Sequence, residues 1–238
     1  MPKARINDIN MYYEMHGQGE PIVLINGLSS DLKEIMPIIR RLSLKCRVLA
    51  FDNRGAGRTD KPDSPYSIVQ MAGDTAALMD AAGMKQAHVV GISMGGRIAM
   101  ALALQHVEKV KSLVLVSTFA RQRSVRGRVA RVRHLNIVDR IPLVRSIVSR
   151  YKQPAYAFER QFKASRGYDC SDRLGGIHTS TLILHGATDT LAPIGLAEEM
   201  HAGINGSQMI TFQGGHLFFT DEPEKFCDLI LDFLSAIH

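Results

Sequence analysis

The stretch "HVVGISMGGRIAMALALQH", residues 88–106, passes from a buried-strand pattern directly into a helical one. Apolar residues lead up to Ser93, and after Gly96 they recur with helical spacing. Ser93 itself stands between Gly91 and Gly95. A tight turn between strand and helix strains its central residue and exposes that side chain at the carboxyl end of the sheet, where open α/β folds bind ligands. The pattern predicts a nucleophilic serine, and the alternative is an ordinary glycine-rich turn.

Strand and helix patterns alternate on both sides of this turn. Apolar or β-rich runs predict strands at residues 9–17, 21–26, 46–51, 87–92, 110–117, 179–186 and 207–212. Helical spacing lies between them near residues 32–42, 67–84, 95–106 and 194–201, and it returns at the C-terminal end, where Phe226, Ile230, Phe233 and Leu234 share a face. Repeated strand–helix units predict an α/β fold with a mostly parallel sheet and helices on both faces.

The alternation stops between residues 119 and 176, which we interpret as an insertion. We therefore predict a core of residues 1–118 and 177–238 with a short helical cap of residues 119–176. From Arg121 to Lys152 the sequence has nine Arg, one Lys and one Asp, a local net charge of +9. A charge run is by default a solvated helix face or a subunit contact. The functional alternatives are attraction of an anionic substrate, a phosphorylated carrier, an acidic partner or an anionic membrane, which makes Arg121–Lys152 candidates for substrate binding.

Composition narrows the class of protein. The chain has 238 residues, 45% of them hydrophobic, and a net charge of +6 that belongs to the arginine-rich segment, so we expect no nucleic-acid partner. No apolar run has the length of a membrane span and no signal peptide is visible, so we expect a cytoplasmic protein without a transmembrane segment. Cys46, Cys170 and Cys227 are widely spaced, as in a chain of reduced thiols without a metal site.

Two further polar residues follow predicted strands and complete a candidate catalytic set. Asp189 comes just after the strand in "LILHGATDTLAP", and His216 lies in the loop after the next strand, in "FQGGHLFF". Both are expected at the same sheet edge as Ser93, where a base would activate the serine and an acid would orient the base. The alternatives are a helix N-cap for Asp189 and a surface loop for His216. The remaining candidates, His88, His178 and His185, are interpreted as structural.

Taken together, the motifs "NGLSS", "FDNRGAGRTD", "GISMGG", "HGATD" and "GGHLFFTDEPEKF" resemble the α/β-hydrolase family, of the small esterase, enol-lactonase and regulator-hydrolase type. The resemblance covers the chain outside the insertion. It implies Ser93 as nucleophile, Asp189 as acid and His216 as base. It also implies an oxyanion hole formed by the backbone amides of Leu28 and Met94.

The chain departs from the family's pattern in the loop after the third strand. The family usually has His–Gly there, whereas this sequence has Asn26–Gly27. Because the donor is a backbone amide, the oxyanion hole is expected to survive, with Asn26 altering how the loop is braced. Asp52 and Arg54 in "FDNRGAGRTD" are expected to order their loop rather than to take part in chemistry. Haloalkane dehalogenases and epoxide hydrolases of this fold have Asp where Ser93 stands, so the resemblance disfavours them.

The resulting prediction is a serine hydrolase that cleaves a small-molecule carboxylic ester or lactone through an acyl-enzyme, with no metal, nucleotide or flavin cofactor. Two alternatives stay open. An acyl thioesterase would use the same residues, with the basic cap binding a phosphorylated carrier. A slow-hydrolysing receptor or regulator would keep the triad but stall near one turnover. The oligomeric state is also open, and a homo-oligomer is possible.

Overall fold

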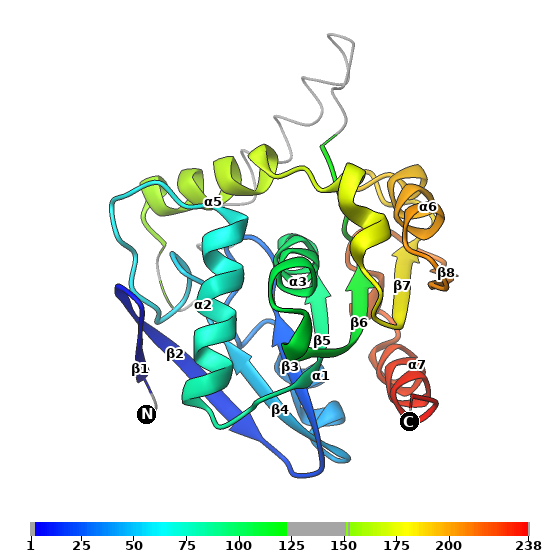
Figure 1. The fold of residues 1–238 in the computed structure, drawn as a ribbon, viewed down its shortest axis with the longest axis horizontal. Helices are drawn as coiled ribbons and strands as arrows, with labels where there is room; N and C mark the ends of the chain where they lie inside the picture. Colours follow the sequence, from blue (N-terminus) through cyan, green and yellow to red (C-terminus); the bar gives the residue numbers. More distant parts are fainter. Residues whose placement is uncertain (1–2, 123–150, 152, 238) are drawn as a thin grey trace, which may run out of the picture.

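The computed structural model describes residues 3–122, 151 and 153–237. Within these ranges eight strands form one sheet in the order β1-β2-β4-β3-β5-β6-β7-β8 (Figure 1). Strands β1 and β2 form an antiparallel hairpin that joins β4 in antiparallel register, and all other neighbours are parallel, which confirms the predicted mostly parallel sheet. The strands are β1 Lys3–Ile6, β2 Ile9–His16, β3 Glu20–Ile25, β4 Cys46–Phe51, β5 Ala87–Ile92, β6 Val110–Val116, β7 Thr181–Gly186 and β8 Gln208–Phe212.

Helices cover both faces of this sheet, as predicted (Figure 1). One hydrophobic core lies between the sheet and α2, α3 and α6, and a second lies between the opposite face and α1 and α7. Strands β3, β4, β5, β6 and β7 are almost wholly buried, because both of their faces are covered. The described helices are α1 Met36–Leu42, α2 Ile68–Ala81, α3 Met94–Gln105, α5 Ala155–Gly167, α6 Ile194–Gly203 and α7 Pro223–Ser235, with short 3₁₀ turns η1 Val107–Lys109, η2 Ser171–Gly176 and η3 Phe218–Thr220.

Helix α2 begins and ends at local sequence signals, whereas the start of α1 does not. The hydroxyl of Ser67 caps α2 by accepting a hydrogen bond from the Gln70 amide at 3.0 Å, and Gly83 ends the helix with a φ of 66°. The first helix was expected from about Leu32, but α1 starts only at Met36. Tertiary structure explains the difference, because the Leu32 amide donates to Asp52 Oδ1 at 2.9 Å and the preceding residues form turns.

The C-terminal helix buries the face that its spacing predicted. Phe226, Ile230, Phe233 and Leu234 are all buried against the sheet and α1. Phe218 lies between α7 and β8 and packs edge-on against Phe226. This aromatic packing holds the segment after β8, which carries His216, against the core.

Part of the predicted insertion is described. Helix α5 lies across the carboxyl ends of the strands, and η2 leads from it to β7 (Figure 1). Residues 123–150 and 152 fall outside the described residues, and most of the arginines of the segment Arg121–Lys152 lie among them. The division into a core and a cap therefore stays a prediction.

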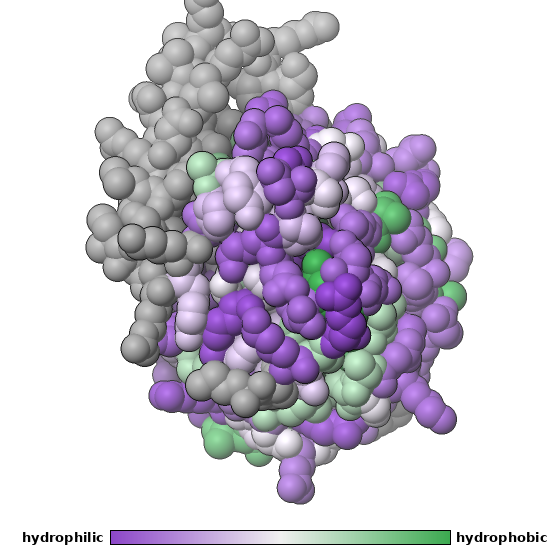
Figure 2. All heavy atoms as spheres, turned by 90° about the vertical axis from the view of Figure 1, so that its left-hand side faces the viewer, coloured by the Kyte–Doolittle hydropathy of each residue, from purple (hydrophilic) through white to green (hydrophobic). Residues whose placement is uncertain are grey.

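Figure 2 shows the face over the N-terminal hairpin as largely hydrophilic, with small, separate apolar patches. Among the described residues, no helix is both long and apolar enough to span a membrane. Cys46, Cys170 and Cys227 are free and buried.

Candidate active site

Ser93 occupies the turn between β5 and α3, in the strained conformation that its sequence context predicted. Its φ is 55° and its ψ is −117°, a backbone region that residues other than glycine rarely adopt. A Cβ on Gly91 would lie 2.5 Å from the Gly95 carbonyl oxygen, and one on Gly95 would lie 2.1 Å from the Ile25 carbonyl oxygen. The two glycines therefore let the strand, the helix and the loop after β3 approach closely. Ser93 remains partly exposed at the carboxyl edge, at the N-terminus of α3.

The structure brings together the three residues predicted from separate loops. His216 Nε2 lies 3.0 Å from Ser93 Oγ, and His216 Nδ1 lies 2.7 Å from Asp189 Oδ2. Asp189 is buried and His216 is partly exposed. A carboxylate at Nδ1 fixes the proton there, which leaves the Nε2 lone pair facing the serine hydroxyl. The arrangement can therefore transfer a proton from Ser93 to His216.

The second oxygen of Asp189 is also committed. Asp189 Oδ1 accepts hydrogen bonds from the amides of Leu191 and Ala192, at 2.8 and 2.9 Å. This resembles the helix-capping role considered from the sequence, except that the capping turn precedes α6 and the other oxygen faces His216. With both oxygens engaged, the carboxylate has a single orientation toward the ring.

His185 packs beside Asp189 but has a different role from His216. Its Nε2 donates to the Ala192 carbonyl at 2.6 Å, and Asp189 Oδ2 is 3.5 Å away. Burial lowers the pKa of His185, so the ring stays neutral at neutral pH. His185 therefore supports the turn that holds Asp189, which agrees with the structural role predicted for it. His178 is exposed.

The end of β6 contributes two hydroxyl groups that sequence reasoning missed. Ser117 Oγ donates to the His216 carbonyl at 2.8 Å, and Thr118 Oγ1 donates to the Ser93 carbonyl at 2.7 Å. The two hydroxyls thus hold the backbones of the serine and the histidine in place. The sequence did contain a signal for them. Both residues follow the buried strand β6, which is the neighbour in the sheet of β5, the strand that leads to Ser93.

The loop after β3 reaches the same site. A Cβ on Gly27 would lie 3.4 Å from the Cβ of Ser93, so the loop touches the turn that carries the serine. Asn26 braces the base of this loop, because its Nδ2 donates to the Asp31 carbonyl at 3.0 Å and its Oδ1 accepts from the Gly27 amide at 2.8 Å. Leu28 follows Gly27, and Met94 is the first residue of α3, whose amide has no partner within the helix. Both predicted oxyanion donors therefore belong to segments that meet at Ser93.

The loop after β4 is ordered by the two residues to which that role was assigned. Asp52 accepts from the amides of Leu32 and Arg58, at 2.9 and 2.8 Å, and burial raises its pKa. Arg54 is buried and pairs with Asp74 at 2.7 Å and with Asp8. Although burial opposes its charge, these two carboxylates raise the pKa of Arg54. Neither Asp52 nor Arg54 contacts the Ser93–His216–Asp189 set through a hydrogen bond given by the described residues.

A buried cation lies one helical turn after Ser93. Arg97 donates to the Tyr168 carbonyl, and its guanidinium carbon lies 4.4 Å from the centre of the Phe119 ring. In the described structure its Nε and Nη1 have no hydrogen-bond partner. Burial lowers the pKa of Arg97 to about 10, so the side chain is still charged at neutral pH. It joins α3 to the segments that leave β6 and α5, and nothing in the sequence singled it out.

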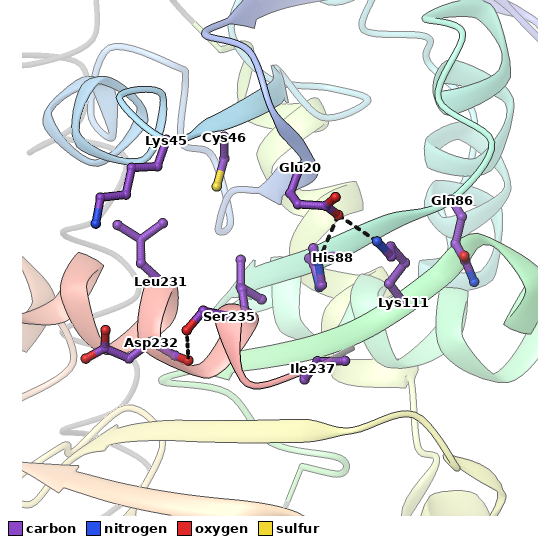
Figure 3. A pocket seen from close by; sticks show the side chains of 11 residues that line it. Glu20, Lys45, Cys46, Gln86, His88, Lys111, Leu231, Asp232, Ser235 and Ile237 are labelled. Atoms are coloured by element: carbon purple, nitrogen blue, oxygen red, sulfur yellow. Dashed lines mark hydrogen bonds and ion pairs between the residues drawn. The ribbon is translucent and has the colours of Figure 1, made fainter.

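A groove of about 520 Å³ lies at the opposite edge of the sheet (Figure 3). It is lined by residues at the amino ends of the strands, among them Glu20, His88 and Lys111. His88 Nδ1 lies 2.7 Å from Ser112 Oγ, and His88 Nε2 lies 3.7 Å from Glu20 Oε2. Because Ser93 stands at the carboxyl ends, this groove is separate from the candidate active site. Among the described residues no group of three or more His, Cys, Asp or Glu side chains is placed to hold a metal ion.

Comparison with known proteins gives matches along the whole chain. A family model described as alpha/beta hydrolase fold matches residues 20–129. A relative from Azorhizobium caulinodans, named as a candidate carbamate hydrolase (RutD), is 30% identical over 100% of this chain and 99% of its own length. The enol-lactonase of Burkholderia xenovorans superposes with a TM-score of 0.83 at 27% identity, covering 98% of this chain and 100% of that one. An esterase from Exiguobacterium antarcticum gives a TM-score of 0.83 at 25% identity, covering 98% of each chain.

Proposed function

Because this chain belongs to the α/β-hydrolase fold family and is a hydrolase, we propose that it cleaves a carboxylic ester or lactone with Ser93 as nucleophile, His216 as base and Asp189 as orienting acid. One observation carries this proposal. A continuous chain of contacts links Asp189 to His216 at 2.7 Å and His216 to Ser93 at 3.0 Å, at the partly exposed end of β5.

The proposed reaction has two halves. In the first, His216 Nε2 takes the Ser93 proton while Oγ attacks the substrate carbonyl, and the amides of Leu28 and Met94 bind the resulting oxyanion. The N-terminal end of α3 adds a favourable dipole at the same point. Collapse expels the leaving group, which receives the proton from His216, and leaves an acyl-enzyme. In the second half His216 takes a proton from water, and the hydroxide adds to the acyl carbon. The bond to Ser93 Oγ then breaks, His216 returns the proton to Oγ, and the carboxylic acid leaves.

The similarity to the Azorhizobium protein favours carbamate hydrolysis as a second candidate, because the match covers 99% of that relative's length. Ser93 would attack the carbonyl in the same way, but this carbonyl carries a nitrogen where the carbonyl of an ester carries a carbon. Thioester cleavage also stays open, with the arginines of Arg121–Lys152 as candidate contacts for a phosphorylated carrier. We keep the assignment of residues 119–176 to a cap as part of this proposal.

A fluorophosphonate probe and a matched pair of variants test the nucleophile. Ser93→Ala is expected to abolish labelling and to lower kcat by about a million-fold, with the fold intact because one small side chain replaces another. Ser112→Ala is the control, since Ser112 Oγ also lies beside a histidine ring nitrogen, Nδ1 of the buried His88, at 2.7 Å. It is expected to keep full labelling. Persistent labelling of the Ser93 variant would refute the assignment.

A substrate panel separates the candidate reactions. Ester, lactone, thioester and carbamate substrates of matched acyl size are compared by kcat/KM with the purified chain. A highest value for an ester or lactone supports the proposal, and a highest value for the carbamate or the thioester favours that alternative. Multiple turnovers per chain separate any of these enzymes from a receptor that stalls after one event.

A further inference from the structure

Two glutamines, Gln153 just before helix α5 and Gln161 within it, reach the loop that carries Leu28. Gln161 lies within α5 and is fully buried, and its Oε1 accepts from the Ser29 amide at 2.9 Å. Its Nε2 donates to the Arg54 carbonyl at 2.7 Å, in the loop after β4. Gln153 precedes the helix, donates to Gly55 O at 2.7 Å and accepts from the Ser29 hydroxyl. A hydrogen bond of 3.1 Å joins the two glutamines.

These contacts converge on a strained turn. The Ser30 amide donates to the Gly27 carbonyl at 3.3 Å, so residues 27–30 form a β-turn with Leu28 and Ser29 at its corners. Ser29 has a φ of 63°, which a turn of type II requires at its second corner and which normally selects glycine. A serine would relax by turning over the central peptide, between Leu28 and Ser29, to the commoner type I turn. Strain of this kind persists only where the surroundings hold it.

Gln161 supplies that restraint. Its Oε1 accepts from the N–H of the central peptide, so turning this peptide over would break the bond and point the Leu28 carbonyl at an acceptor. Gln153 adds a second restraint, because it accepts a hydrogen bond from the Ser29 hydroxyl. Both glutamines are fixed in turn by carbonyls of the loop after β4, which lies on the core. The conformation of the Leu28 turn is therefore determined by α5.

We propose that Gln161, assisted by Gln153, is a positioning residue for the oxyanion hole: α5 must be seated on the sheet edge for the Leu28 amide to be aimed at the oxyanion. This inference rests on the proposed function, since it assigns that amide to the reaction. A flip of the central peptide leaves the φ of Leu28 nearly unchanged, so the Leu28 amide is affected through the position of the whole turn. Because Gly27 contacts the turn that carries Ser93, a shift of residues 27–30 after loss of these hydrogen bonds moves the Leu28 amide relative to the nucleophile. Gln161 itself touches no reacting atom and acts only through the backbone.

Gln161→Leu tests the proposal, because leucine has comparable bulk but removes every hydrogen bond of the side chain. Tyr156→Phe is the matched control. The Tyr156 hydroxyl donates to the Lys61 carbonyl at 2.7 Å, so this variant removes a bond between α5 and the core that does not reach the Leu28 turn. Turnover of a p-nitrophenyl ester is normalised to the sites that a fluorophosphonate titrates. Inhibition by a boronic acid, which adds to a serine as a tetrahedral anion, is measured in parallel.

We expect Gln161→Leu to lower kcat per titrated site by about tenfold to a hundredfold, in line with the loss seen when a donor is misplaced rather than removed. Binding of the boronic acid should weaken in parallel while KM changes little. Tyr156→Phe should keep both values within about twofold of the parent. A purely structural role would lower the number of titrated sites and leave kcat per site unchanged, and that result would overturn the proposal.

Gln153→Leu keeps the test decisive if the buried variant does not fold, because Gln153 is only partly buried. The same parallel loss of kcat and boronic-acid binding, smaller in size, is expected for it, and unchanged values would overturn the proposal. Failure of the proposed function is seen separately, as labelling or turnover that survives in Ser93→Ala. Loss of both in Ser93→Ala with a normal Gln161→Leu protein would reject the positioning role alone.

Discussion

Replacing Asp189 by asparagine should disable the candidate active site without unfolding it, because the surroundings decide how the new amide points. In the parent, Oδ1 accepts from the amides of Leu191 and Ala192 at 2.8 and 2.9 Å, and Oδ2 faces His216 Nδ1 at 2.7 Å. An asparagine that turned its NH₂ toward the two amides would leave buried donors unpaired, each at a cost of about 1–3 kcal/mol. The asparagine oxygen therefore keeps the amides, and the NH₂ group faces His216.

That orientation forces the wrong tautomer on the ring. Nδ1 must accept from the asparagine NH₂, so the proton moves to Nε2, which stands 3.0 Å from Ser93 Oγ. A protonated Nε2 cannot take the serine proton. Mutants with this defect lose about ten-thousand-fold in kcat, which is about 5.5 kcal/mol at about 1.4 kcal/mol for each factor of ten. We expect the same loss for Asp189→Asn, with little change in the unfolding midpoint.

The assay is steady-state hydrolysis of a p-nitrophenyl ester together with the rate of fluorophosphonate labelling, both of which need the deprotonated serine. Asp221→Asn is the control, because Asp221 is an exposed acid in the same loop as His216. It should leave both rates within about twofold of the parent. If Asp189→Asn keeps kcat within about tenfold of the parent, another group orients His216 and the assignment of Asp189 is wrong.

Two further predictions concern charge. Burial lowers the pKa of His88 and of His185 below the value of about 6.5 that both have when unfolded, so the unfolded chain binds more protons and stability falls as the pH drops below about 6.5. Between about pH 7.5 and about pH 5.5, the midpoint of urea unfolding should fall less in His88→Asn than in the parent, whereas the exposed control His178→Asn should behave like the parent. An equal fall in His88→Asn and the parent would contradict this prediction. If the arginine-rich segment faces the substrate, the ratio of kcat/KM for an anionic over a neutral ester should fall as the screening length shortens from about 30 Å at 0.01 M salt to about 8 Å at 0.15 M. Glutamine at positions 126, 128, 131 and 133 should abolish that preference, and a ratio that is flat in the parent would leave the segment as a solvated face or a subunit contact.

Local sequence patterns were sufficient for most of the fold. The apolar runs of β4 and β5 and the helical spacing of α7 depend on neighbours a few residues away, and the structure has these elements where the patterns predicted them. The start of α1 was predicted too early because Asp52, from the loop after β4, binds the Leu32 amide. Spacing within a segment carries no information about such a partner.

The sequence by itself also placed Ser93, Asp189 and His216 at one edge, since parallel strands all present their carboxyl ends there. Only the tertiary structure decided what surrounds them. Gln161 binds the Ser29 amide across 132 residues of chain, and in the sequence it is one polar residue in an amphipathic helix. Its burial and its partners arise when α5 docks on two loops. Hydrogen bonds between distant segments follow no periodicity, so the support of the site could be read only from the folded chain.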